Sequence, residues 1–157
     1  MTAPVVRFVP ARGKHVDRIA KRMRPADVAE CRAMAGLSAR AGLKRSMQNS
    51  QAWAVLVNGR PEAMFGTSDL NVLAGVGSAW FLGTGEVDRH PKEFLRLSRE
   101  WLPKLFSRYC VLRNVVAVDN SASIRWLKWL GAEFSPPIDV GGVPFVLFEL
   151  RKPRDVR

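Results

Sequence analysis

The sequence has 157 residues, 47% of them apolar, so a single domain with a substantial hydrophobic core is expected. Two cysteines exclude a disulfide framework, and no stretch is apolar for long enough to be a membrane span or a signal peptide. The net charge is +11, and residues 1–50 hold 11 basic side chains against 3 acidic ones. Such a positive field attracts nucleic acid, anionic lipid or acidic substrates, although a solvated basic surface explains it equally well.

The first half of the chain combines one strand, several helices and a block of strands. The predicted elements are a strand over residues 5–9, a helix over 15–23, a helix from Pro25 to Gly36, a short helix over 38–47, and strands over 52–57, 62–67 and 77–84. Proline suits the first turn of a helix and glycine the position just after its end. The segment "NGRP" between two period-two runs predicts a hairpin turn, and Gly42 is expected to weaken the short helix.

The second half alternates helices and strands. A long amphipathic helix begins at Pro91, and Pro103 is expected to kink or interrupt its last turns. A strand covers 110–118, a tryptophan-rich helix covers 123–130, and a last strand covers 143–150. The tryptophan-rich helix is apolar around most of its circumference and is therefore expected to be largely buried. This order predicts one domain over residues 1–150, with a mixed central sheet covered by helices, and a basic tail over 151–157.

The cysteines and histidines indicate no metal chemistry. Cys31 and Cys110 both lie among apolar residues and are expected to be buried. His15 and His90 are far apart and have no ligand-forming neighbour at metal spacing. No metal cofactor is predicted, and the composition fits a cytoplasmic protein.

The stretch "VAVDNSASIRWLKWLGAEF", residues 116–134, carries the most specific signal. A strand ends at Asn120, a small residue follows at Ser123, and a helix ends at Gly131. With the order of elements, this stretch resembles the GNAT family of acetyl-CoA-dependent N-acetyltransferases over about residues 5–150. The resemblance implies an α/β (α+β) fold with six to seven strands and about four helices, acetyl-CoA as co-substrate and an amine as acceptor. Leu127 stands where many relatives carry a tyrosine acid, and Ala132 replaces the usual phenylalanine.

The resemblance also implies a cofactor site. In this family the fourth strand leaves free backbone groups for the pantetheine arm, which places Phe81, Leu82 and Gly83 beside it; the alternative is an ordinary core strand. Asn120 and Ser123 would bind the cofactor from the next strand end, although capping the helix explains Asn120 equally well. The segment "LGTGEVDRHPKEF" occupies the place of the phosphate-binding loop, where Arg89 and His90 would supply positive charge and Asp88 could instead cap the helix.

Glu86 is the nearest carboxylate after the fourth strand and is the candidate general base for the acceptor amine. An exposed loop glutamate is the alternative. Tyr109, the only tyrosine, is expected to pack at the end of the long helix with a hydrated hydroxyl group.

A narrower resemblance concerns "HPKEFLRLSREWLPKLF" and "MRPADVAECRAMAG", which are similar to stretches of the GNAT-like internal virion proteins of short-tailed phages. It implies an alternative function as a catalytically degenerate virion or assembly protein, with phage assembly proteins as partners and a location in the host cytoplasm or the virion. A third hypothesis is weak nucleic-acid binding by a basic cluster, which consists of Arg18, Lys21, Arg22, Arg24, Arg40, Lys44 and Arg45.

Overall fold

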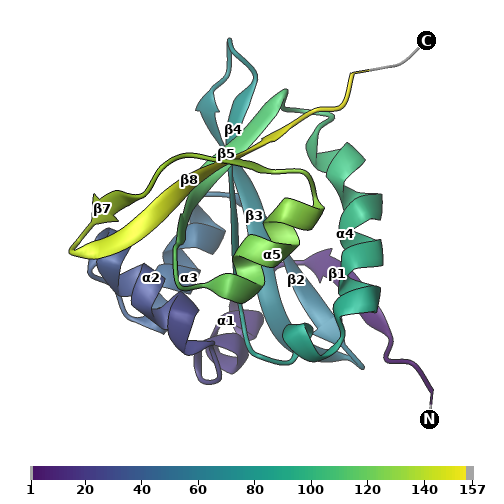
Figure 1. The fold of residues 1–157 in the computed structure, drawn as a ribbon. Helices are drawn as coiled ribbons and strands as arrows, with labels where there is room; N and C mark the ends of the chain where they lie inside the picture. Colours follow the sequence, from purple (N-terminus) through teal and green to yellow (C-terminus); the bar gives the residue numbers. More distant parts are fainter. Residues whose placement is uncertain (1, 155–157) are drawn as a thin grey trace.

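The computed structural model describes residues 2–154 (Figure 1). Its helices are α1 (Gly13–Ala20), α2 (Pro25–Ala35), α3 (Ala39–Gln48), α4 (Pro91–Leu105) and α5 (Ser121–Trp129), with a 3-10 turn η1 (Val87–Arg89). Its strands are β1 (Val6–Pro10), β2 (Gln51–Val57), β3 (Arg60–Asn71), β4 (Val76–Gly83), β5 (Val111–Ala117), β6 (Glu133–Phe134), β7 (Ile138–Val140) and β8 (Val143–Arg151). The predicted alternation of strands and helices is confirmed.

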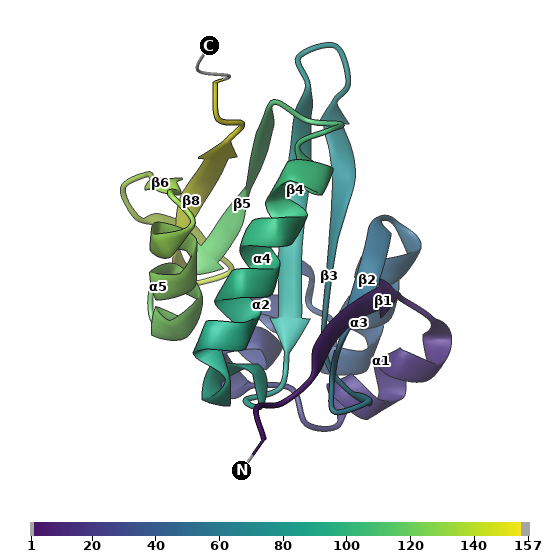
Figure 2. The same cartoon turned by 90° about the vertical axis from the view of Figure 1, so that its right-hand side faces the viewer.

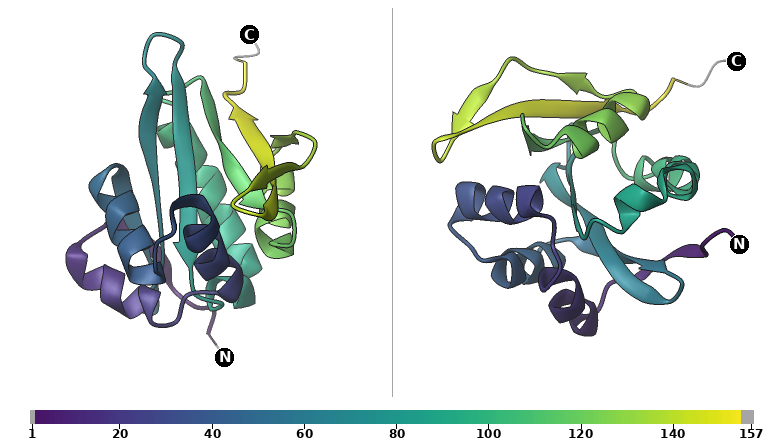
Figure 3. Two further views of the ribbon diagram at one scale, coloured as in Figure 1. Left: turned by 90° about the vertical axis from the view of Figure 1, so that its left-hand side faces the viewer. Right: turned by 60° about the horizontal axis from the view of Figure 1, so that its bottom comes forward.

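One mixed sheet forms the centre of the molecule. The strand order is β1-β2-β3-β4-β5-β8-β6, with β7 also paired to β8, and β4–β5 is the parallel pair in an otherwise antiparallel sheet. Helices α1, α2 and α3 lie on one face, and α4 and α5 lie on the other (Figures 2 and 3). The predicted fold class is thereby confirmed.

Within residues 2–154, the sheet has eight strands and is accompanied by five α-helices, slightly more than expected. The added strands are β6 and β7, which lie between the tryptophan-rich helix and the last predicted strand. With two and three residues they are too short to produce a periodic pattern, and both depend on pairing with β8.

The hairpin between β2 and β3 shows how local sequence determines local structure. Asn58 and Gly59 have φ values of 50° and 80°, both in the left-handed region. Asparagine and glycine tolerate this region best, and two such residues match the twist of the flanking strands. The predicted hairpin is therefore confirmed, with Val57 opposite Arg60.

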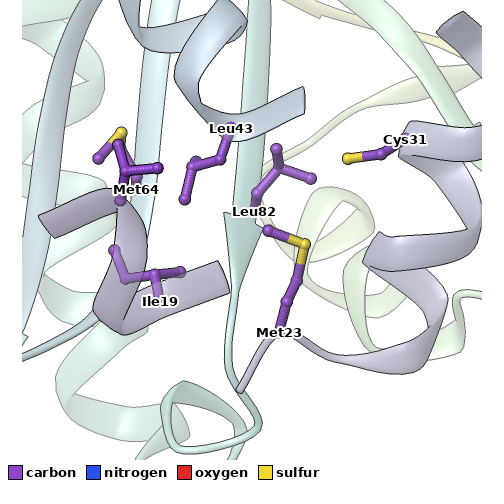
Figure 4. Packing of buried hydrophobic residues seen from close by; sticks show 7 residues of the cluster. Ile19, Met23, Cys31, Leu43, Met64 and Leu82 are labelled. Atoms are coloured by element: carbon purple, nitrogen blue, oxygen red, sulfur yellow. The ribbon is translucent and has the colours of Figure 1, made fainter. Parts of the chain in front are cut away.

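A hydrophobic cluster joins α1, α2 and α3 to the sheet (Figure 4). Ile19 and Leu43 are fully buried against Met64 and Leu82 of the central strands. Gly42 allows α3 to approach α2, because a Cβ atom at this position would lie 2.8 Å from the Sγ atom of Cys31. The glycine that lowers helix propensity is thus required by the packing of the two helices.

Three local expectations need correction or refinement. Helix α5 is less buried than predicted: Trp129 is 41% exposed, and the guanidinium of Arg99 lies 3.9 Å above its ring, because α5 covers the sheet with one face only. Cys110 is exposed, whereas Cys31 is buried as expected. Helix α4 continues through Pro103 and ends two residues later.

Candidate active site

The gap between β4 and β5 is the most distinctive feature of the sheet. The two strands pair in parallel only over residues 76–78 and 111–113 and then separate (Figure 2). Where they part, the Nδ2 of Asn114 donates to the carbonyl oxygen of Ala79 at 2.9 Å, and its Oδ1 accepts from the Val115 N–H at 2.8 Å. The side chain of Asn114 thereby replaces the ladder bonds that the diverging strands lose.

A cavity of about 390 Å³ occupies this gap and reaches helices on both faces of the sheet. Most of its wall is apolar. The residues that line it from the elements flanking the gap include Glu30, Cys31, Ala79, Trp80, Phe81, Leu82, Val115, Val116, Ser123, Trp126 and Leu127. Burial raises the pKa of the Cys31 thiol to about 11, so this side chain stays protonated and is a poor nucleophile.

Two hydrogen-bonding groups beside the cavity are unused. The Gly83 N–H donates to Asp27, and the Gly83 carbonyl oxygen accepts from the Arg24 N–H, so the peptide groups of Gly83 point away from β3. Alternate residues of a strand direct their peptide groups to the same side. The peptide groups of Phe81, two residues earlier in β4, therefore also face the gap. The indole Nε1 of Trp126 is buried and has no hydrogen-bond partner within residues 2–154. Buried N–H groups are nearly always bonded, so the indole N–H, which no solvent-sized space touches, is available to a ligand that shifts the Trp126 ring.

The wide end of the gap is closed by a buried ion pair from the start of α2. Arg24 donates to both carboxylate oxygens of Asp27, at 3.0 and 3.1 Å, and Asp27 also accepts from the Gly83 N–H at 2.9 Å. Arg24 is only 10% exposed and reaches Asp88 at 3.2 Å and the Ser123 hydroxyl at 3.2 Å. This arrangement joins α2, β4, η1 and α5 at one point.

Glu30 connects the same helix to the end of β5. Its Oε1 accepts from the Ala117 N–H at 2.9 Å and from the Nδ2 of Asn120 at 3.1 Å. Burial raises the pKa of the Glu30 carboxyl, although both hydrogen bonds act in the opposite direction. The second donor bond of Asn120 goes to Asp27, and its Oδ1 caps α5 by accepting from the Ser123 N–H.

The loop after β4 contains the other predicted residues. Glu86 lies 3.3 Å from the Nε2 of His90 and 3.4 Å from Arg89, and it is not among the residues that line the cavity. Helix α4 begins at Pro91, which has no N–H to offer an anion. The loop therefore has positive charge, but Glu86 and Asp88 partly neutralise it.

The structure brings only part of the predicted site together. Phe81, Leu82 and Ser123 line the cavity, Gly83 and Asn120 lie at its wide end within the α2 hydrogen bonds, and Glu86, Arg89 and His90 form a separate group in the loop. Sequence reasoning missed Glu30 and the free N–H of Trp126. No local signal marks either one, since each depends on contacts between distant segments.

The basic cluster expected to attract nucleic acid is smaller than its sequence indicates. Arg22 bonds to Glu62 at 2.8 Å, Arg24 is buried beside Asp27, and Arg40 bonds to Asp17 at 2.6 Å. Nucleic-acid binding stays a prediction.

Tyr109 is buried, and its hydroxyl donates to Asp69 at 2.6 Å, so a carboxylate takes the place of the expected water.

Within residues 2–154, no helix has the length and apolar character of a membrane span, and no cluster of three or more acidic, histidine or cysteine side chains is arranged to hold a metal ion.

Comparison with solved structures places the architecture. The chain superimposes on a GCN5-related N-acetyltransferase from Brucella melitensis with a TM-score of 0.66 at 16% identity, covering 93% of this chain and 75% of that one. It superimposes on a GNAT-family acetyltransferase from Bacillus anthracis with a TM-score of 0.69 at 9% identity, covering 96% of this chain and 97% of that one. It superimposes on the ribosomal-protein-S18-alanine N-acetyltransferase from Escherichia coli with a TM-score of 0.67 at 11% identity, covering 98% of this chain and 99% of that one. The chain has the GNAT fold.

Sequence comparison adds a similarity to a phage protein family over part of the chain. A family model described as "Bacteriophage T7, probable scaffold protein Gp13" matches residues 63–137, a little under half of the chain. The matched segment runs from β3 to just before β7 and so includes both strands of the gap in this GNAT fold. No curated protein matches the chain.

Proposed function

We propose that this chain binds acetyl-CoA in the gap between β4 and β5 and transfers its acetyl group to an amine. The observation that carries the proposal is the cavity of about 390 Å³ at the splayed strands, with unused N–H groups beside it. A long, mostly apolar ligand with a few amide groups suits such a cavity, because its amides can pair with the free backbone and indole donors.

The residues present fit the pantetheine arm of acetyl-CoA better than its phosphates. The peptide groups of Phe81 would pair with the amides of the arm, and the indole N–H of Trp126 would donate to one of its oxygens. The phosphates would lie near Arg89 and His90, where they would have to displace Glu86 from both side chains. Cofactor binding by Asn120 would require its amide to leave Asp27 and Glu30.

Acetyl transfer would proceed by direct attack of the amine on the thioester. The protonated Cys31 thiol gives no support for a covalent enzyme intermediate. Leu127 offers no acid for the leaving thiolate, and the hydroxyl of Tyr109 is bonded to Asp69 outside the cavity wall. Proton transfer must therefore use a carboxylate or water.

We expect Trp126→Phe to weaken the affinity for acetyl-CoA by about five- to tenfold, because a ligand would lose one hydrogen bond of roughly 1 kcal/mol. The smaller ring also loses part of the packing of Trp126 against Phe81 and Phe94, so the melting temperature of the variant is measured beside its affinity. Isothermal titration calorimetry with acetyl-CoA measures the affinity. Trp129→Phe on the exposed side of the same helix is the matched control and should bind like the wild type. The proposal fails if the wild-type chain releases no heat with acetyl-CoA.

A second candidate function is phage virion assembly, which the family match over residues 63–137 favours. In this case the GNAT fold would serve as a scaffold, the partners would be phage assembly proteins, and the chain would be found in the host cytoplasm or the virion. Immunoblotting of purified virions and assembly intermediates from phage-infected cells tests the idea. Absence of the chain from every assembly fraction would contradict it.

A further inference from the structure

We propose that Glu30 of α2 takes the proton from the acceptor amine, and that the amine reaches it from the face of the sheet covered by α2 and α3. This inference rests on the proposed acetyl-CoA site. It assigns the catalytic carboxylate to a helix of the N-terminal third and away from the loop that follows β4.

The position of Glu30 is the first argument. Glu30 lines the cavity, whereas Glu86 does not. Its Oε1 is held by the Ala117 N–H at 2.9 Å and the Asn120 amide at 3.1 Å, which orients the carboxylate. The hydrogen bonds of Glu30 within residues 2–154 all go to Oε1, and Glu30 lines the cavity, so the second oxygen of a held carboxylate is left for an acceptor amine.

The surroundings of Glu30 suit a base that must accept a proton near neutral pH. Burial and the neighbouring Asp27 raise the pKa of Glu30, while its two hydrogen bonds and Arg24 lower it. Arg45 of α3 is the other charged residue among those that line the cavity. A carboxylate with a raised pKa is a stronger base than an exposed one.

The α2–α3 side also offers a polar entrance. Arg45, Ser46, Asn49 and Ser50 line this side of the cavity. A smaller polar pocket of about 290 Å³ adjoins it and shares Asn49, Ser50 and Ser68 with it. Serine hydroxyl groups and the asparagine amide can hold a polar amine by hydrogen bonds, without pairing it with a charge. The acceptor class is therefore a polar amine, and it would meet the thioester from the face opposite to α4 and α5.

The proton and bonds balance without another reactant. The amine nitrogen attacks the thioester carbonyl carbon, so a C–N bond forms and the C–S bond breaks. The proton lost by the nitrogen moves to the free oxygen of Glu30 and then to the departing thiolate sulfur. Glu30 returns to its carboxylate form, and the missing tyrosine acid at Leu127 is not required.

The decisive variant is Glu30→Gln, because the amide oxygen still accepts from Ala117 and Asn120 while the side chain can no longer take a proton. Acetyl-CoA affinity is measured by calorimetry. Turnover is measured by thiol release with three probe amines: a lysine-containing peptide, a peptide with a free N-terminal amine, and spermidine. We expect affinity within about twofold of the wild type and a kcat lower by about 10²–10⁴-fold, the usual contribution of general base catalysis. Glu133→Gln, an exposed glutamate on β6, is the matched control.

The pH profile separates catalysis from a structural role. The wild-type kcat/KM should rise with pH as Glu30 loses its proton, and this limb should disappear in Glu30→Gln. Unchanged turnover in Glu30→Gln, or a loss found only in Glu86→Gln, would overturn the assignment while the acetyl-CoA site stands. Binding without thiol release from any probe amine would overturn it as well. No binding by the wild type would instead remove the proposed function itself.

Discussion

Replacing Asp27 with asparagine is expected to lower the free energy of unfolding by about 3–5 kcal/mol, the usual cost of removing one partner from a buried ion pair. Arg24 is 10% exposed and its guanidinium does not lose its proton, so the variant leaves a buried charge whose remaining ion-pair partner is the half-exposed Asp88. The Gly83 N–H also loses its carboxylate acceptor. Urea unfolding followed by circular dichroism measures the effect.

The matched control is Asp17→Asn, which removes an aspartate bonded to the exposed Arg40. Surface ion pairs contribute little because water and salt screen them, so the unfolding midpoint should stay at the wild-type value. If Asp27→Asn shifted the midpoint no more than this control, the pair at the wide end of the gap would be hydrated and would not hold α2 against β4.

Leu43→Ala is the second substitution with a large expected effect, a loss of about 2–5 kcal/mol. Leu43 is 0% exposed and packs from α3 against Ile19, Met64 and Leu82 (Figure 4). Removing three carbon atoms there deletes apolar contacts and leaves a cavity that the surrounding helices and strands fill only in part. Thermal and urea unfolding both report the loss.

Leu73→Ala controls for the chemical change, because Leu73 at the β3–β4 hairpin tip is 101% exposed and surface substitutions usually change stability by less than about 0.5 kcal/mol. A loss below about 1 kcal/mol for Leu43→Ala would mean that α3 can move inward to close the space. The cavity beside α3 would then change shape, and the acetyl-CoA affinity of the variant would show it.

The choice of catalytic carboxylate illustrates what chain order does not show. Glu86 is the first carboxylate after β4 and is a reasonable candidate by position. The fold turns it toward His90 and Arg89, whereas Glu30, 87 residues before its partner Ala117, lies beside the gap. The role of Glu86 stays a prediction, and the comparison of the two glutamine variants decides between them.

Local signals were sufficient for most of the architecture. Pro25 and Gly36 bound α2, Asn58 and Gly59 form the hairpin turn, and the alternation of elements predicts a mixed sheet covered by helices. These features depend on backbone preferences and on hydrophobic periodicity within a few residues, which a single sequence records directly.

Only the tertiary structure decided which polar groups meet at the gap. The hydrogen bond between Glu30 and Asn120 joins residues 90 positions apart, and the bond between Asp27 and Gly83 joins residues 56 positions apart. The indole N–H of Trp126 is unpaired because no acceptor of another segment within residues 2–154 lies within bonding distance of it. The strands β6 and β7 likewise exist only through β8. Such features arise from the packing of whole helices and strands, whose relative positions no short stretch of sequence specifies.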